Sequence, residues 1–458
     1  MRILMLGWEF PPHISGGLGT ACYGLTKGLS RLGAEVLFAL PRPVASALPS
    51  HVKFVAPSRS LSASDALAAA ESLANVKIRP IDARLYPYAA SSAQLVPVGE
   101  GRAWALGSGP ALASATALQY SGQGSPLSAG AAHAAPIRAV PDDPYGRGLF
   151  FEVSRYVDSV CCVAAEEAFD LVHAHDWMTF PAAAAVARQS GKPLVVHVHS
   201  TEFDRSGEGV NPQVYEIERA GMHAAHKVIA VSRRTKRICT ERYGVPEEKV
   251  CVVYNAVEHD GWADPEPIAS DDKVVLFLGR ITMQKGPEYF VAAARRVLEK
   301  VPEAKFIMAG AGDKMNATVE LAAHMGIGHR VLFTGFLAKA DVARAFRRAA
   351  VYVMPSVSEP FGITPLEALA SDVPVIISKQ SGVAEVLRHA LKVDFWDIDE
   401  MANKIVAVLS RPALRETLRQ NGSSEARKFD WTLSARRCLD VYSSALAFAP
   451  AAPMARAG

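Results

Sequence analysis

The chain has 458 residues, more than a single hydrophobic core usually holds, so we expect two domains. With 49 basic and 46 acidic residues, its formal net charge of +3 argues against nucleic acid as the main partner. No apolar run is long enough for a signal peptide or a membrane span, and the six cysteines form no CxxC pair, so we expect a cytoplasmic protein.

Short apolar runs alternate with helical patterns along the chain. The first series of predicted strands comprises Arg2–Leu6, Glu35–Leu40, Leu171–Ala174, Leu194–His199, Lys227–Val231 and Val250–Tyr254. A helix is predicted at Thr20–Leu32, because apolar residues recur there at helical spacing and Gly33 follows as a stop signal. The second series of strands comprises Val274–Leu278, Lys305–Ala309, Val331–Thr334, Val351–Met354 and Val373–Ile377. This alternation predicts an α/β fold with two Rossmann-like domains, whose parallel sheets are covered on both faces.

Three segments set the predicted domain limits. A polar stretch with two prolines at 261–272 separates an N-terminal domain, 1–262, from a second domain, 263–430. Residues 89–140 are rich in Ala, Ser and Gly, so they are predicted to form a flexible insertion, with a mobile lid as the alternative. A final helix is predicted at 431–447, and a disordered tail at 448–458.

Two loops that follow predicted strands carry candidate ligand-binding residues. Gly16 and Gly17 lie between the first strand and its helix, where they allow the backbone to approach a ligand. Arg280 and Lys285 follow the first strand of the second domain, at the edge where open α/β sheets bind ligands. Two cations there could neutralise a diphosphate. The alternatives are a tight turn for the glycines and a solvated surface for the cations.

A third motif occupies residues 358–370. Glu359 and Glu367 lie eight residues apart around the start of a predicted helix, and carboxylates can accept hydrogen bonds from sugar hydroxyls. The backbone N–H groups before the helix could face an anion; the residues concerned are Phe361, Gly362, Ile363 and Thr364. Thr364 and Glu367 also match a capping box, so Glu367 could instead serve only the helix end.

Four histidines occur near the ends of two predicted strands. His173 and His175 precede Asp176, and His197 and His199 end a later strand. Within each pair the side chains share one face of the strand. A zinc site is an alternative for this cluster, but we predict no metal ligand, and we expect His173 and His197 to be packed, hydrogen-bonded core residues. The basic run 233–237 is predicted to be a solvated helix face, with a membrane-surface contact as an alternative that is not expected.

Together these motifs resemble those of the retaining glycosyltransferases of family 4, which have the GT-B fold. The matching pieces are GGLG at 16–19, HAHDW at 173–177, VVYNAVE at 252–258, GRITMQKG at 279–286, the pair Glu359 and Glu367, PVI at 374–376 and the closing helix 431–445. The resemblance covers nearly the whole chain outside 89–140. It implies two facing Rossmann-like domains with an interdomain cleft, and a last helix that crosses back to the first domain.

The resemblance also implies roles for individual residues. Glu367 should bind the donor ribose, Glu359 should face the donor hexose, and His199 should lie near the transferred sugar. Arg280 and Lys285 should hold the diphosphate. The remaining donor-binding residues implied by the motifs are Gly16, Gly17, Phe361, Gly362, Ile363 and Thr364. The catalytic set is His199, Glu359, Arg280 and Lys285, and neither a metal nor an organic cofactor should be required.

The opening segment WEFPPHISGGLG and the sequence EPFG at 359–362 are similar to those of glycogen and starch synthases. This similarity implies ADP- or UDP-glucose as the donor and a glucan as the acceptor. A family 4 enzyme acting on a lipid-linked or surface-polysaccharide acceptor is the alternative. A metal-dependent hydrolase built on the histidines is a further one.

Overall fold

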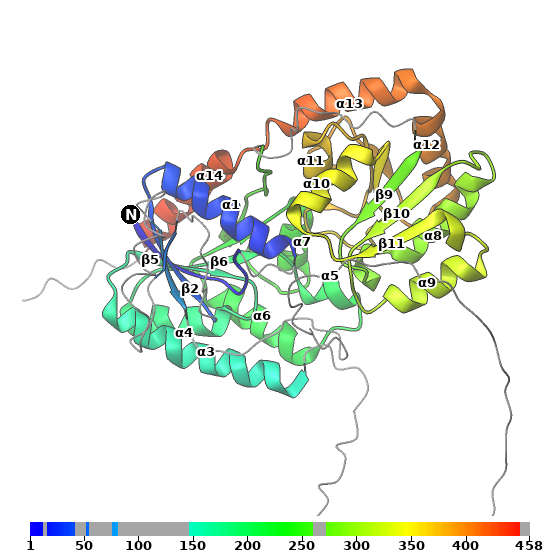
Figure 1. Ribbon diagram of the computed structural model, residues 1–458. Helices are drawn as coiled ribbons and strands as arrows, with labels where there is room; N and C mark the ends of the chain where they lie inside the picture. Colours follow the sequence, from blue (N-terminus) through cyan, green and yellow to red (C-terminus); the bar gives the residue numbers. More distant parts are fainter. Residues whose placement is uncertain (12–15, 42–51, 55–75, 81–145, 260–271, 449–458) are drawn as a thin grey trace, which may run out of the picture. The chain divides into compact units, whose positions relative to one another are not determined.

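The computed structural model describes residues 1–11, 16–41, 52–54, 76–80, 146–259 and 272–448 (Figure 1). Apart from Gly146 these residues belong to one compact unit. The predicted insertion at 89–140 lies outside the described residues, as do most of the predicted boundary at 261–272 and nearly all of the predicted tail.

The first sheet has eight strands in the order β3-β4-β2-β1-β5-β6-β7-β8, and all neighbours pair in parallel. The central β1 is buried on both faces, with Ile3, Leu4, Met5 and Leu6 fully covered, as expected for a parallel sheet between helices. The strands are β1 (Arg2–Leu6), β2 (Glu35–Leu40), β3 (Val52–Phe54), β4 (Val76–Pro80), β5 (Leu171–His175), β6 (Leu194–Val198), β7 (Lys227–Ala230) and β8 (Val250–Val252). The helices among them are α1 (Gly17–Arg31), α3 (Gly146–Glu166), α4 (Phe180–Ser190), α5 (Glu202–Ser206), α6 (Pro212–Ala224), α7 (Arg233–Glu241) and the 3-10 helix η1 (Glu247–Lys249).

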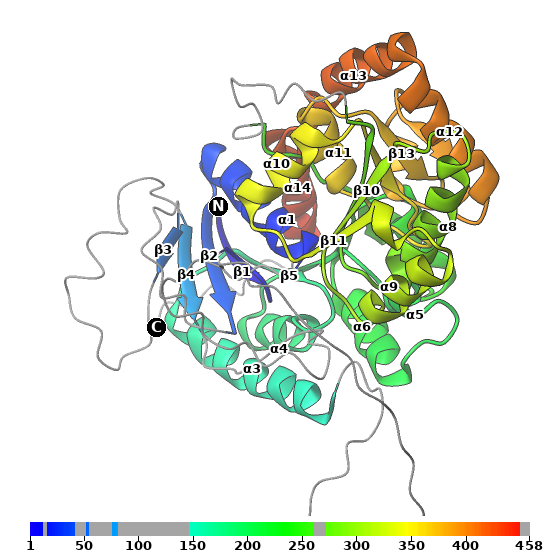
Figure 2. The same cartoon turned by 45° about the vertical axis from the view of Figure 1, so that its right-hand side comes forward.

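The second sheet has six parallel strands in the order β11-β10-β9-β12-β13-β14. Three of them, β10, β11 and β13, are labelled in Figure 2. Its strands are β9 (Val274–Leu278), β10 (Lys305–Ala309), β11 (Val331–Gly335), β12 (Val351–Met354), β13 (Val375–Ser378) and β14 (Leu391–Val393). The helices that accompany it are α8 (Pro287–Leu298), α9 (Met315–His324), α10 (Lys339–Arg348), α11 (Thr364–Ala370), α12 (Ile398–Ser410), α13 (Pro412–Ala426), and the 3-10 helices η2 (Met283–Lys285), η3 (Gly328–Arg330) and η4 (Gly382–Glu385).

The last helix, α14 (Trp431–Phe448), packs against α1, and the two lie side by side in Figure 1. Two glycines of α1 make the close approach possible. A Cβ on Gly24 would lie 2.2 Å from the Trp431 ring, and one on Gly28 would lie 2.5 Å from the Trp431 carbonyl oxygen. The C-terminal helix therefore belongs to the same layer as the first helix of the chain, and it also reaches the first sheet through a hydrogen bond between Tyr442 and His173.

The predicted α/β fold is confirmed, and most differences from the predicted elements are at their ends. The strand predicted at Val373–Ile377 begins two residues later, at Val375, and the helix predicted at Thr20–Leu32 begins at Gly17. The strands β3, β4 and β14 were not predicted. They extend the two sheets at one margin each: β4 pairs with β2, β3 pairs with β4, and β14 pairs with β13. No helix among the described residues combines the length and the apolar character needed to cross a membrane.

Candidate active site

The loop after β9 brings Lys285 to the second sheet's ligand-binding edge. The chain leaves the strand through Gly279 and forms η2, and then turns at Gly286, whose φ of 62° is in the left-handed region that favours glycine. A Cβ on Gly286 would also lie 2.4 Å from the Pro355 carbonyl oxygen. Both the positive φ and the close approach to Pro355 therefore favour glycine at position 286. The turn at this glycine places Lys285 beside the loop that follows β12.

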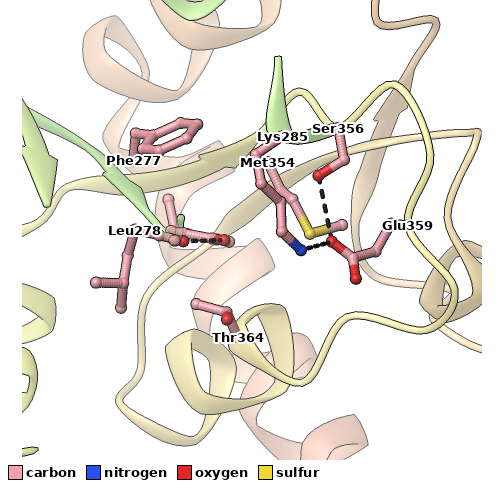
Figure 3. A pocket seen from close by; sticks show the side chains of 9 residues that line it. Phe277, Leu278, Lys285, Met354, Ser356, Glu359 and Thr364 are labelled. Atoms are coloured by element: carbon pink, nitrogen blue, oxygen red, sulfur yellow. Dashed lines mark hydrogen bonds and ion pairs between the residues drawn. The ribbon is translucent and has the colours of Figure 1, made fainter. Parts of the chain in front are cut away.

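Lys285 and Glu359 form an ion pair in a small cavity (Figure 3). The Lys285 Nζ atom lies 2.6 Å from Glu359 Oε2, and the two side chains are only 21% and 9% exposed. The Ser356 hydroxyl donates to the same oxygen at 3.3 Å. The cavity has a volume of about 30 Å³, and Tyr352, Met354 and Thr364 also line it. Lys285 and Glu359, two predicted site residues that lie 74 positions apart in the sequence, are thus in direct contact.

The segment from Glu359 to Ile363 is fixed to the loop before η4 by backbone hydrogen bonds. Glu359 N–H donates to the Gln380 carbonyl at 3.0 Å, and Val383 N–H donates to the Phe361 carbonyl at 2.7 Å. Gly362 adopts a φ of 103°, which a residue with a side chain rarely does. Phe361 and Ile363 are buried side chains. They pack into the core, so what they can offer a ligand is their backbone N–H groups.

Glu367 lies in the first turn of α11, half-buried. The capping-box alternative for this residue is wrong, because the helix begins at Thr364 with Ile363 as its N-cap, and no side chain caps it. Burial raises the pKa of Glu367 to about 7, which nearby Lys339 partly opposes. The buried Tyr352 lies close to both glutamates, whose charges help to raise the pKa of its hydroxyl after burial, the larger cause. Glu359 and Glu367, the two glutamates predicted from the sequence, therefore both lie near Tyr352.

The glycine loop after β1 lies next to the predicted diphosphate-binding arginine. An ideal Cβ on Gly16 would be 4.0 Å from Arg280 Nε, so these two residues come together although 264 positions separate them. Gly17 is exposed, and a Cβ there would meet no atom within 4 Å. The first turn of α1 has no side-chain cap. Its N–H groups therefore remain able to bind an anion.

His199 is held at the end of β6 by two neighbours from the end of β5. The Asp176 carboxylate accepts from the His199 N–H at 2.7 Å, and Nε2 of the His199 ring lies 2.9 Å from Nδ1 of His175. Burial lowers the pKa of His199 to about 3, so its ring is neutral at physiological pH. His199 is not among the residues that line the cavity of Lys285 and Glu359.

The connection from His199 to that cavity runs through α5. Asp204 on this helix accepts a 2.6 Å hydrogen bond from the hydroxyl of Ser358, the residue before Glu359. The helix also packs against η2, which carries Lys285. Sequence reasoning missed Asp204, Ser358, Ser356 and Tyr352. Asp204 belongs to a Thr-x-x-Asp capping box with Thr201, a pattern that could have located the start of α5. Ser358 occurs in no recognisable pattern, and Tyr352 could have been found as a polar side chain within a predicted strand.

The remaining histidines form a buried row beside His199. His173 is hydrogen-bonded to Tyr442 at 2.7 Å, which confirms the prediction for that residue. His197 is buried as predicted, but the predicted hydrogen bond is wrong, because neither of its ring nitrogens has a partner among the described residues. Nε2 of His173 and Nε2 of His175 are likewise buried without a partner there. Each such atom costs about 1–3 kcal/mol when nothing satisfies it.

The basic run at 233–237 is only partly a solvated face. Glu385 accepts hydrogen bonds from the N–H groups of Arg233 and Arg234 at the start of α7, and Arg234 donates to Ser358 at 3.0 Å. A second cavity of about 250 Å³ lies here, with Phe203, Glu208, Arg234, Arg237, Arg242 and Ser358 in its wall. The two cavities adjoin through the neighbouring residues Ser358 and Glu359.

Family models for sugar transfer match three consecutive parts of the chain. Residues 2–84 match the starch synthase catalytic domain, residues 124–260 match glycosyltransferase family 4, and residues 260–425 match the glycosyl transferases of group 1. Among solved structures, sucrose-phosphate synthase from Thermosynechococcus elongatus is similar at a TM-score of 0.69 and 19% identity, covering 98% of this chain and 99% of that one. Anabaena HepE in complex with UDP and glucose is similar at a TM-score of 0.65 and 18% identity over 97% and 100%.

The two parallel sheets and the cluster at their strand ends therefore define a GT-B glycosyltransferase. The chain matches the family 4 model over residues 124–260 and the group 1 model over residues 260–425, and it is similar to glycogen synthases. A glycogen synthase of Mycobacterium tuberculosis is 25% identical over 97% of this chain and 95% of its own length. An uncharacterized glycosyltransferase of Methanocaldococcus jannaschii is 27% identical over 97% and 99%. A D-inositol 3-phosphate glycosyltransferase of Kribbella flavida is 27% identical over 60% and 72%.

Proposed function

We propose that this glycosyltransferase moves a hexose, glucose in the first instance, from ADP- or UDP-glucose to a glucan with retention of the anomeric configuration. The observation that carries the donor site is the cluster of Lys285, Glu359, Ser356 and Thr364 in one cavity. That cavity lies at the carboxyl ends of β9 and β12, where open α/β sheets bind ligands. The glycogen synthase relative supports glucan as the acceptor. All six cysteines are free thiols, which agrees with a cytoplasmic location.

The ion pair between Lys285 and Glu359 suggests how the donor enters. A cavity of about 30 Å³ is much smaller than a nucleotide sugar needs, so we propose that the pair separates when the donor binds. Lys285 then exchanges the carboxylate for the diphosphate, and Glu359 is freed to accept from hexose hydroxyls. Arg280, together with the N–H groups of Gly362 and Ile363, adds further positive charge around the leaving group.

In the proposed reaction, the bond between C1 and the diphosphate oxygen breaks while the acceptor oxygen forms a bond to C1 from the same side. The acceptor proton passes to the leaving diphosphate. Catalysis then rests on positioning and charge neutralisation, and each well-placed donor contributes on the order of 2.7–4 kcal/mol by analogy with an oxyanion hole. On this mechanism no residue acts as a covalent nucleophile, and we propose that neither metal nor organic cofactor is required.

Glu367 gives the donor site a predicted pH dependence. Its carboxylate, which we assign to the donor ribose, loses its proton as the pH rises through about 7. The charged form accepts two hydroxyl hydrogen bonds, so the dissociation constant of the donor should fall as the pH rises from about 6 to 8. Isothermal titration with the nucleotide sugar over this range measures it.

The matched control is Glu367→Gln, which cannot titrate and should bind the donor more weakly and without this pH step. The control is needed because burial also raises the pKa of Asp176 to about 7. A pH step of equal size in the variant and the wild type would contradict the role of Glu367.

A phosphorylated acceptor is the second candidate, favoured by the arginines of the larger cavity. Arg237 lines this cavity, and its guanidinium forms no ion pair with any described residue. An anion on the acceptor could therefore bind there without breaking an existing contact. The Kribbella flavida relative is named for D-inositol 3-phosphate, which agrees with an acceptor of this class. A lipid-linked or surface-polysaccharide acceptor remains the third candidate.

A matrix of donors and acceptors tests the proposal. Purified protein is given UDP-, ADP- and GDP-sugars, alone and with maltodextrin, glycogen or an inositol phosphate, with and without EDTA. We expect nucleotide release from one glucose donor, stimulated by glucan and unchanged by EDTA, and NMR of the product should show the retained anomer. Faster release with the inositol phosphate, together with a KM for that acceptor that rises in Arg237→Ala, would favour the second candidate instead. Loss of turnover on addition of EDTA, in protein whose circular dichroism shows that it is still folded, would overturn the metal-free mechanism.

A further inference from the structure

The first sheet contains a row of three buried histidines that have no role in the proposed sugar-transfer site. His173 and His175 are two residues apart on β5, so their side chains lie on the same face of the sheet. His197 lies on β6 directly opposite His175. All three side chains are at most 2% exposed. Buried imidazoles normally find hydrogen-bond partners, because a polar group removed from water otherwise loses its contacts without replacement.

In both His173 and His175 the hydrogen-bonded nitrogen is Nδ1, and Nε2 has no partner among the described residues. Nδ1 of His173 lies 2.7 Å from the Tyr442 hydroxyl, and Nδ1 of His175 lies 2.9 Å from His199 Nε2. Nε2 of both rings has no partner among the described residues, and neither has any nitrogen of His197. His173 and His175 thus resemble metal-binding histidines, in which a neighbour holds one ring nitrogen and the other nitrogen binds the ion.

The three rings are also close enough to share one ion. One ligand atom from each of the three rings lies within 4.8 Å of the other two. An ion at the centre of a triangle with such edges is roughly 2.8 Å from each nitrogen. Each ring would therefore move by less than about 1 Å to reach a Zn–N distance of about 2.0–2.1 Å. Burial lowers the pKa values of all three rings, so they are in the neutral form that binds metals.

We propose that His173, His175 and His197 form a buried structural site for one divalent transition-metal ion, with Zn²⁺ as the best match. Imidazole ligands select zinc, copper or nickel over magnesium and calcium. None of the three residues lines either cavity described above. The site is therefore separate from the donor cavity, and the proposed ion takes no direct part in the sugar transfer.

The ion would also fix the proton positions of the neighbouring rings. With Nε2 of His175 on the metal, its proton lies on Nδ1 and is donated to Nε2 of His199. The proton of the neutral His199 ring must then lie on Nδ1. His199 would thus offer a hydrogen-bond donor, and not an acceptor, on the side away from His175.

Metal content tests this inference without any sugar substrate. The full chain, purified with a tag that contains no histidine, is incubated with Zn²⁺, passed through gel filtration in metal-free buffer and measured by elemental mass spectrometry. We expect about one Zn²⁺ per chain and a higher Tm than for protein treated with a chelator. A Co²⁺-loaded sample should show the visible absorption of a tetrahedral imidazole site.

His197→Thr is the informative variant, because no described residue forms a hydrogen bond with the His197 ring and threonine suits a strand. It should retain at least tenfold less Zn²⁺ than the wild type and lose the Co²⁺ band. His324→Asn, at an exposed position on α9, should behave as the wild type. Equal Zn²⁺ in His197→Thr and wild type would mean surface binding only and would overturn the proposal. So would folded wild type that retains no Zn²⁺, Co²⁺ or Ni²⁺, whether or not the variant folds.

Discussion

Replacing both Arg280 and Lys285 with alanine should lower the kcat for donor turnover by at least on the order of 10²–10³, the effect of deleting one oxyanion donor. Both side chains follow β9, and Lys285 already binds a carboxylate at 2.6 Å in the cavity that we assign to the donor. Without them nothing of equal charge faces the leaving diphosphate. Initial rates with saturating donor, with the single variants measured alongside, check this expectation.

A surface lysine of the same sheet supplies the control. Lys305 pairs with Asp272 where both side chains are about half exposed, so Lys305→Ala should leave kcat unchanged. Because removal of Lys285 leaves Glu359 without its ion partner, the Tm of each variant is measured as well. A folded double variant with turnover within tenfold of the wild type would contradict the diphosphate role.

Replacing Arg205 with alanine should destabilise the protein by about 3–5 kcal/mol, because the change leaves two buried carboxylates without their cationic partner. Arg205 Nε lies 3.0 Å from Glu202, and its guanidinium also binds Glu218. These two glutamates are 0% and 3% exposed. The change also removes the hydrogen bond from Arg205 to the Ser200 carbonyl at 3.2 Å, next to His199. Urea unfolding followed by circular dichroism measures the loss.

The size of this loss should depend on pH in a defined direction. Burial already raises the pKa of Glu218, which Arg205 opposes, so loss of Arg205 should raise this pKa further. A carboxyl whose pKa is raised in the folded state contributes stability at low pH and loses it as the pH rises through the folded pKa. The variant should therefore be closest to wild type near pH 5 and furthest from it near pH 8.

Arg295→Ala is the matched control, because the pair of Arg295 with Glu299 is largely exposed, and its loss should cost less than about 1 kcal/mol. Arg205→Lys keeps the charge without the fork and should fall between wild type and Arg205→Ala. An alanine variant within 1 kcal/mol of wild type across this pH range would show that the two glutamates are satisfied without Arg205.

Local pattern was sufficient for most of the fold. Alternating apolar runs predicted eleven of the strands, because a buried parallel strand must be apolar on both faces. The edge strands β3 and β14 and the neighbouring β4 escaped, since strands at the margin of a sheet depend on pairing with their neighbours more than on their own composition. The capping-box alternative failed for a similar reason. Thr364 fits the pattern, but the turn at Gly362 and the packing of Ile363 set the helix start one residue earlier than that pattern requires.

The sequence by itself determined which residue types lie at the strand ends: glycines after β1, cations after β9 and glutamates around α11. These positions follow from short-range rules of strand, turn and helix, and the motifs repeat them in order. Only the tertiary structure decided which of these groups touch. It pairs Lys285 with Glu359, places Gly16 beside Arg280 and sets His175 against His199. Such contacts depend on sheet order and on helix packing, which bring together residues that are distant in the chain. The local sequence around each residue does not indicate its partner.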